Sequence, residues 1–127
     1  MALILDANAV SALLGGAPAL AERLANADRH HLPVIVVGEY RYGLMRSRHH
    51  RHLGMLLDSL VRESILLRID ETTAQHCAEV RDELRTRGRP IPENDVWIAA
   101  LARQHDEPVV SRDKHFEEVH GLRVVSW

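Results

Sequence analysis

Hydrophobic and polar positions divide the chain into blocks, and five short apolar runs are its clearest feature. The runs are ALIL at 2–5, PVIVV at 33–37, ILLRI at 65–69, PVV at 108–110 and LRVVSW at 122–127. Short apolar runs of this kind are typical of strands that are buried on both faces. We therefore expect five strands, all within one sheet.

The segments between these runs have the spacing of helices, with apolar residues three or four positions apart. Residues 72–87 are the clearest case, because apolar positions recur there among charged ones. Helices are predicted over 8–14, 18–27, 39–47, 50–63, 72–87 and 94–105. Strands that alternate with helices predict the α/β class, with a five-stranded parallel sheet and helices on both of its faces.

Length and composition limit what the chain can be. Its 127 residues, 46% of them hydrophobic, suit a single domain that spans 1–127. Cys77 is the only cysteine, which excludes an internal disulfide and a zinc site built from thiolates. The sequence has no glycine-rich nucleotide loop, signal peptide or long apolar run, so we expect a cytoplasmic protein that neither binds dinucleotides nor enters a membrane.

Acidic side chains follow three of the predicted strands. Asp6 comes directly after the first run, Glu39 follows the second after one glycine, and Asp113 follows PVV after two residues. The carboxyl ends of parallel strands meet at one edge of a sheet, where ligand sites collect. A single acid in such a position is more often a solvated loop residue, but three in the same position indicate a cluster.

Asp95 has two interpretations. In PENDVWIAA (92–100) it precedes an apolar run, so by itself it indicates a helix start, with Asn94 or Asp95 as the capping residue. A helix that returns to the sheet can also present its first turn to the edge where the other acids lie. We favour the second role and expect Asp95 to bind a metal before it acts as a cap.

Clustered carboxylates repel one another and need a compensating cation. Carboxylate oxygens without cysteine or a histidine pair suit Mg²⁺ or Mn²⁺. A cation of this kind activates water and neutralises charge on a phosphoryl group, so the cluster favours hydrolysis of phosphodiester bonds.

Four blocks of the sequence resemble the signature blocks of the PIN domain. They are LILDAN (3–8), VVGE (36–39), ENDVWIAA (93–100) and VVSRDKHF (109–116), in the order of the family and over nearly the whole chain. The closest resemblance is to the ribonuclease toxins of bacterial VapBC toxin–antitoxin modules. It implies a metal-dependent endoribonuclease, a homodimer, and a small antitoxin protein that blocks the site.

The resemblance also implies roles for individual residues. Asp6, Glu39, Asp95 and Asp113 match the acidic quartet that would hold Mg²⁺ or Mn²⁺, and Asn8 and Ser111 match small polar positions behind it. Asn8 and Ser111 equally fit ordinary capping and turn chemistry. The alternative function is a catalytically silent PIN-like domain that binds RNA or a protein.

A basic stretch, YRYGLMRSRHHRHLGMLL (40–57), contains no acid and is the candidate contact for RNA. We weigh this against a solvated helix face, which is the usual role of a charge run. RTRGRP (85–90) forms a second basic patch. The histidines at 49, 50 and 52 lack a partner cluster, so phosphate contact or solvation is favoured over metal binding. The residues expected to contact RNA are Arg41, Arg46, Arg48, Arg51 and Arg112.

The net charge of −2 does not exclude a polyanionic partner. The chain has 16 basic and 18 acidic residues. If the four acids of the quartet are set aside, the basic residues exceed the remaining acids by two. The surface around the site can therefore be basic although the whole protein is not.

Overall fold

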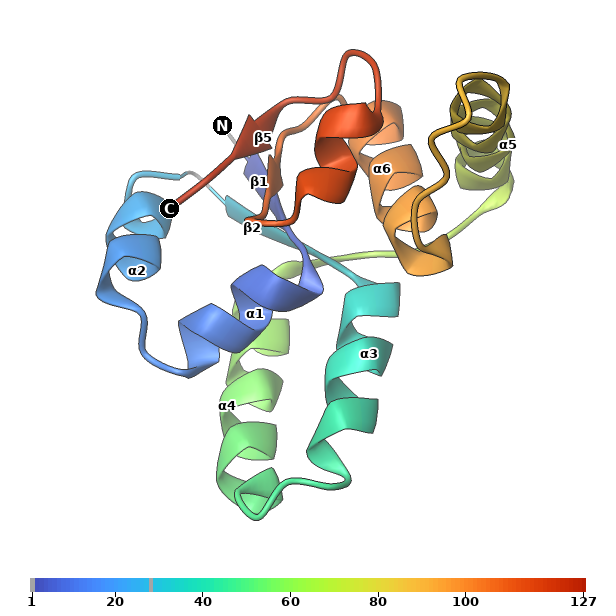
Figure 1. Cartoon of the computed structure of the whole chain (residues 1–127). Coiled ribbons are helices and arrows are strands. Elements are labelled where there is room, and N and C mark those ends of the chain that lie inside the picture. Colours follow the sequence, from blue (N-terminus) through green and yellow to red (C-terminus); the bar gives the residue numbers. More distant parts are fainter. Residues whose placement is uncertain (1, 28) are drawn as a thin grey trace.

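A computed structural model describes residues 2–27 and 29–127 (Figure 1). Strands and helices alternate along most of the chain. In order they are β1 (Ala2–Leu5), α1 (Ala7–Leu14), α2 (Pro18–Ala25), β2 (Arg29–Pro33), α3 (Val34–Leu44), α4 (His50–Glu63), β3 (Ile65–Leu67), α5 (Glu71–Thr86), α6 (Glu93–His105), β4 (Val109–Val110), the 3₁₀ helix η1 (Lys114–Glu118) and β5 (Val124–Val125).

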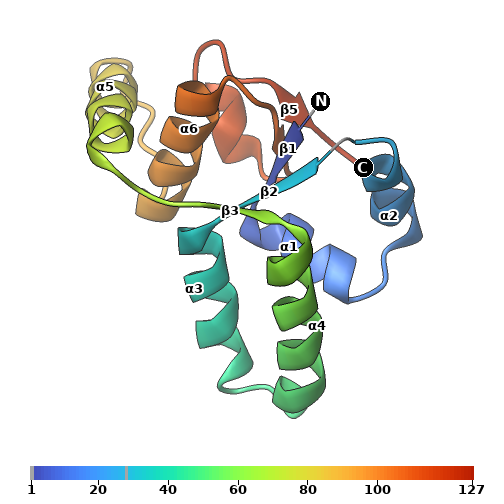
Figure 2. The ribbon, with the colours of Figure 1, turned by 180° about the vertical axis from the view of Figure 1, so that it is seen from behind.

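The five strands form one parallel sheet in the order β3-β2-β1-β4-β5. Strand β1 is central, with Ile4 paired to His31 on one side and to Val109 on the other. Two groups of helices flank the sheet, α1 to α4 in one and α5, α6 and η1 in the other (Figures 1 and 2). The predicted α/β class with a five-stranded parallel sheet is confirmed.

The predicted strand at 33–37 is wrong. The second strand lies earlier, at Arg29–Pro33, and the residues VIVV begin helix α3. A short apolar run cannot be distinguished from a buried helix by its pattern alone, and β-branched residues favour a strand. Pro33 decides the outcome, since it ends β2 with φ −63° and stands as the N-cap of α3.

The error moves Glu39 from a loop after a strand to the second turn of α3. Because α3 starts at the carboxyl end of β2, Glu39 still lies at the expected edge of the sheet. The other predicted elements differ from the observed ones by a few residues at their ends, and β1 and α4 match residue for residue.

The core is mainly aliphatic and is built around β1, β4 and α6. Ile4, Leu5, Val109 and Val110 are fully buried, and so is Leu101. Phe116 fixes η1 to this core, because its side chain is fully buried. Within residues 2–27 and 29–127, no helix is both long and apolar enough to span a membrane.

Helices α3 and α4 form a hairpin that projects away from the sheet (Figures 1 and 2). Its turn, between Leu44 and His50, carries the middle of the basic stretch. Its large exposed apolar side chains are Val34, Tyr42, Met45 and Met55. Glu39 lies near the sheet end of the same hairpin, so one helix connects the acidic edge with the basic turn.

Candidate active site

The four expected acids converge on one hollow at the carboxyl edge of the sheet. Its volume is about 330 Å³, and its lining includes Asp6, Glu39, Asp95 and Asp113. They come from four elements, namely the end of β1, helix α3, the first turn of α6 and the segment after β4. Asn8 and His115 line the same hollow.

Asp6 is the most deeply placed of these acids, with only 3% of its surface exposed. It is the N-cap of α1, because its Oδ1 accepts a hydrogen bond of 2.7 Å from the amide of Ala9. Its Oδ2 accepts a short hydrogen bond from the hydroxyl of Ser111. Ser111 therefore stands directly behind the cluster, where the resemblance implies a small polar residue.

Asp95 does not cap its helix. Pro92 is the N-cap of α6, and no side chain caps that helix end. The Oδ2 of Asp95 lies 2.9 Å from Nδ1 of His115 instead. Two other acids of the cluster do cap helices. Asp6 caps α1, and Asp113 caps η1, where it accepts a 3.0 Å hydrogen bond from the amide of His115.

His115 is the residue of this site that the sequence did not reveal. Its Nδ1 lies 2.8 Å from Oδ1 of Asp113 as well as 2.9 Å from Asp95. The sequence signal was its position two residues after Asp113, but only the fold brings it to Asp95, 20 residues earlier. Asp95, Asp113 and His115 offer three ligand atoms within 4.8 Å of one another.

Burial and mutual repulsion make the cluster a costly place for negative charge. The pKa of Asp6 is raised by burial and further by Asp95 and Asp113, while the hydrogen bonds from Ser111 and Ala9 oppose the rise. Burial also raises the pKa of Glu39, with Asp95 adding to the effect and Asn94 opposing it. For Asp95, burial raises the pKa and the hydrogen bond to His115 opposes it.

The residues present fit a divalent cation. The Oε1 atom of Glu39 is buried without a hydrogen-bond partner, which is costly unless a cation or another donor satisfies it. A donor set dominated by carboxylate oxygens suits Mg²⁺ or Mn²⁺.

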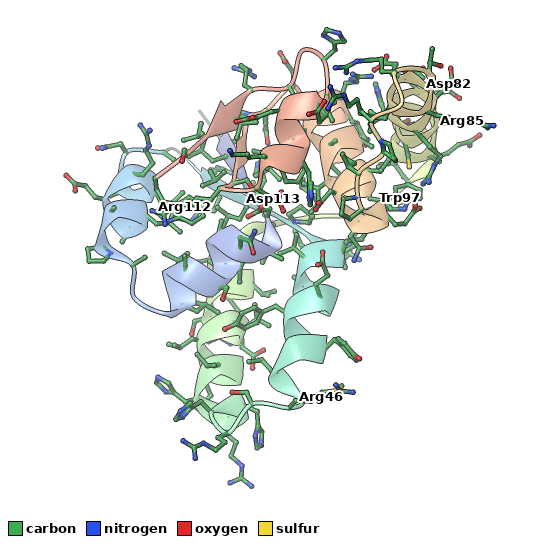
Figure 3. All side chains as sticks on the ribbon, viewed as in Figure 1. Arg46, Asp82, Arg85, Trp97, Arg112 and Asp113 are labelled. Carbon is green, nitrogen blue, oxygen red and sulfur yellow. The ribbon has the colours of Figure 1, made fainter. Side chains whose placement is uncertain are left out.

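The basic residues of the hairpin differ in their surroundings. Arg41 pairs with Asp58 of α4 at 3.0 Å, and the guanidinium of Arg46 lies 5.9 Å from the centre of the Tyr42 ring. Arg48 and Arg51 are exposed, and no acidic partner of theirs is found in the described part of the chain. Figure 3 shows Arg46 at the hairpin turn, away from Asp113 in the centre of the molecule.

Arg112 is bound to the end of the described chain. Its Nε and a terminal nitrogen donate hydrogen bonds of 3.0 and 2.7 Å to the backbone oxygen of Trp127. The same guanidinium lies over the Trp127 ring, 4.6 Å from its centre. A phosphate could use Arg112 only by competing with these contacts.

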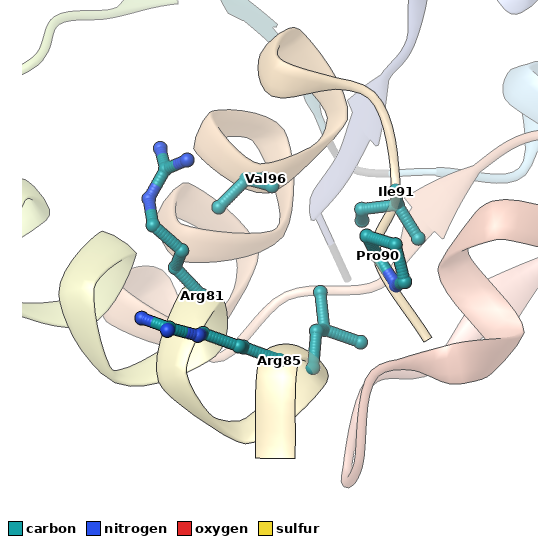
Figure 4. A pocket seen from close by; sticks show the side chains of 6 residues that line it. Arg81, Arg85, Pro90, Ile91 and Val96 are labelled. Atoms are coloured by element: carbon teal, nitrogen blue, oxygen red, sulfur yellow. The ribbon is translucent and has the colours of Figure 1, made fainter. Parts of the chain in front are cut away.

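A second hollow, about 400 Å³ in volume, is lined by residues of α5, of the segment that leads into α6 and of α6 itself. Its lining combines the apolar side chains of Leu84, Pro90, Ile91 and Val96 with those of Arg81 and Arg85 (Figure 4). Arg81 forms an ion pair with Glu93, which lines the acidic hollow. Of the second basic patch, Arg87 and Arg89 both face Glu118, whereas Arg85 and Pro90 line this hollow.

The sequence pattern of the PIN domain matches residues 3–122. Ribonuclease VapC2 of Haemophilus influenzae is 35% identical over 104 residues, covering 80% of this chain and 78% of the relative. The tRNA(fMet)-specific endonuclease VapC of Shigella flexneri is 27% identical over 98% of this chain and 96% of its own.

The fold of this chain also matches that of a chain in a solved VapBC structure. DNA-bound VapBC of Salmonella typhimurium contains a chain that superposes with a TM-score of 0.91 at 25% identity, over 100% of this chain and 98% of that one. The match over residues 3–122 and the identity to VapC2 confirm the resemblance of the four blocks. The chain belongs to the PIN-domain family and, within it, to the VapC ribonucleases.

Proposed function

We propose that this protein is a divalent-metal-dependent endoribonuclease, the toxin of a toxin–antitoxin pair, and that Asp6, Glu39, Asp95 and Asp113 are its metal-binding and catalytic residues. The observation that carries the proposal is the convergence of four carboxylates from four elements on one hollow. Three of the four have a pKa raised chiefly by burial. Such a cluster destabilises the fold unless it binds a cation, so function is the best reason for keeping it.

The chain supplies a cradle for the cation. Asp6 is held rigidly by Ser111 and by its capping bond, which fixes its carboxylate at the end of β1. Asp95 and Asp113 face each other beside it, and Glu39 brings an unsatisfied oxygen from α3. A bound Mg²⁺ or Mn²⁺ would lower the pKa of a water and neutralise charge that develops on the phosphoryl group.

Hydrolysis adds water across one P–O bond of the RNA, leaving a phosphate on one end and a hydroxyl on the other. Glu39 and Asp113 are the groups that orient the attacking water and accept its proton, because both line the hollow. The exposed arginines of the hairpin turn, above all Arg48 and Arg51, contact phosphates away from the cleaved bond. Contact there positions the strand and carries no sequence information.

The proposed function also implies partner proteins. An antitoxin would have to cover the acidic hollow, and the solved structure of VapBC-5 from Mycobacterium tuberculosis is named as a member of the VapBC family of toxin–antitoxin systems. A homodimer and a cytoplasmic location are also proposed, as the family resemblance implies. A single domain over 1–127 agrees with the continuous sheet and core.

The experiment combines metal-stripped protein with total RNA, and initiator tRNA serves as a first defined substrate because one relative is named for it. New RNA ends should form with Mg²⁺ or Mn²⁺, none with EDTA, and none with Asp6→Asn. Cleavage that persists in EDTA or in Asp6→Asn would overturn the proposed site. Binding of RNA without cleavage under all metals would favour the catalytically silent domain.

A further inference from the structure

The imidazole of His115 brings one ring nitrogen close to two carboxylates of the acidic hollow. Its Nδ1 lies 2.9 Å from Oδ2 of Asp95 and 2.8 Å from Oδ1 of Asp113. One ring nitrogen has a single hydrogen or a single lone pair, so it cannot bond fully to both oxygens. Two oxygens and one nitrogen at this spacing also suit a cation, and Asp95, Asp113 and His115 form a group in the described residues that could hold one.

The distances match such a set. In an octahedral site with ligands 2.0–2.1 Å from the ion, neighbouring ligands lie about 2.9 Å apart. The two separations at His115 are 2.9 and 2.8 Å, and all three ligand atoms lie within 4.8 Å of one another. The two nitrogen–oxygen separations are therefore those of adjacent ligands in such a site.

The backbone holds the ring in place. The amide of His115 donates to Oδ1 of Asp113, and the amide of Asp113 receives support from Ser111, whose Oγ accepts its hydrogen bond at 2.8 Å. Phe116, next along the chain, is fully buried and anchors η1. The His115 side chain is 44% exposed, so water and ions reach it, while the backbone that carries it is anchored.

We infer that His115 is a direct nitrogen ligand of the metal, beside Asp95 and Asp113, and that it makes the site favour Mn²⁺ over Mg²⁺. The chemical reason is that imidazole suits transition-metal ions, whereas Mg²⁺ prefers sites made of oxygen alone. This inference rests on the proposed metal site and adds the identity of a ligand and the choice of ion.

The test loads metal-stripped full-length protein with one equivalent of Mn²⁺ and measures its electron spin echo modulation, which detects nitrogen bound directly to the ion. The wild type should show nitrogen modulation, and His115→Gln should bind Mn²⁺ without it. Titration should show that His115→Gln lowers the Mn²⁺ affinity about tenfold, the size of loss seen when a group at a metal site is removed. The Mg²⁺ affinity should change less. His49→Gln, at the exposed start of α4, is the matched control and should change neither.

Two results would overturn the inference: bound Mn²⁺ without nitrogen modulation in the wild type, or equal losses of Mn²⁺ and Mg²⁺ affinity in His115→Gln. The wild-type spectrum decides the question even if the variant does not fold. RNA cleavage by a wild type without nitrogen ligation would overturn this inference alone. Nitrogen ligation without RNA cleavage would overturn only the proposed ribonuclease activity.

Discussion

The hydroxyl of Ser111 donates a hydrogen bond to Oδ2 of Asp6, although the two residues are 105 positions apart in the sequence. Both partners are buried, Ser111 with 1% and Asp6 with 3% of their surface exposed. The bond joins the ends of neighbouring strands β1 and β4. It connects the central strand to the segment that carries Asp113 and His115.

Ser111→Ala should therefore damage the fold and the site together. It leaves a buried carboxylate oxygen without its donor, at a cost of about 1–3 kcal/mol in the free energy of unfolding. Losing a hydrogen bond that lowers the pKa of Asp6 should raise that pKa further and weaken Mn²⁺ binding. Denaturant unfolding and metal titration measure the two effects, and Ser126→Ala, at an exposed serine, is the control. Equal stability of the two variants would contradict the structural role of Ser111.

Asp95→Asn should give a folded protein that binds RNA and does not cleave it. Asp95 makes no cap, so its replacement removes no capping bond. Asparagine is a neutral and weaker ligand, so metal affinity and cleavage should collapse. RNA binding through arginine–phosphate contacts should survive. Asp82→Asn, on the exposed surface of α5 (Figure 3), is the matched loss of one carboxylate and should behave as wild type.

The same variant makes a prediction about pH. Burial raises the pKa of Asp95 in the folded protein above the ordinary value of an aspartate, about 3.8. Its contribution to stability is therefore complete below about pH 4 and is lost as pH rises through the folded pKa. Without metal, Asp95→Asn should become more stable relative to wild type between pH 4 and pH 7. Melting temperatures of both proteins in EDTA across this range measure the difference in stability. A difference that does not change with pH would mean that the pKa of Asp95 is not raised.

Arg48→Ala with Arg51→Ala should weaken RNA binding and make it less sensitive to salt. If both side chains neutralise phosphates of a single strand, the slope of log K against log salt should fall by roughly 1.4, about 0.7 for each contact. Arg29→Ala is the control, because Arg29 begins β2, at the opposite end of that strand from the acidic hollow. Unchanged slopes in the double variant would mean that the basic turn is only a solvated surface.

Arg112→Ala should affect the fold more than the RNA. Its guanidinium holds the backbone oxygen of Trp127 and covers the indole ring. Loss of these contacts should lower the free energy of unfolding by roughly 1–2 kcal/mol and shift the fluorescence of Trp127. Trp97→Phe in the background isolates the signal of Trp127. A large loss of RNA affinity at unchanged stability would return Arg112 to the set of RNA contacts.

The sequence was sufficient for the parts of the site that depend on local order. Asp6 directly follows a strand that any apolar pattern reveals, and Asp113 follows another, so both could be assigned to the carboxyl edge. Glu39 was assigned to the right edge for the wrong reason, because a run of β-branched residues after Pro33 looks like a strand and is a helix. Glu39 nevertheless lies at the predicted edge of the sheet, because α3 begins where β2 ends.

Contacts between distant segments were beyond reach of the pattern. Nothing near His115 in the sequence indicates that η1 would turn its ring toward Asp95 on α6. The commitment of Arg112 to Trp127 depends on β5 lying beside β4, which composition does not encode. Single residues that bridge elements are fixed by tertiary packing, and one sequence does not reveal them.

The acidic hollow draws on residues 6, 39, 95 and 113, and β4 completes it by pairing with the central strand. During translation the first two acids leave the ribosome long before the last two, and domains fold as units once enough chain is available. A growing chain therefore lacks a complete acidic hollow until Asp113 has emerged and β4 has joined the sheet. For a nuclease made among the RNA molecules it can attack, a site assembled from such distant segments delays activity until Asp113 has been made and β4 has paired with β1.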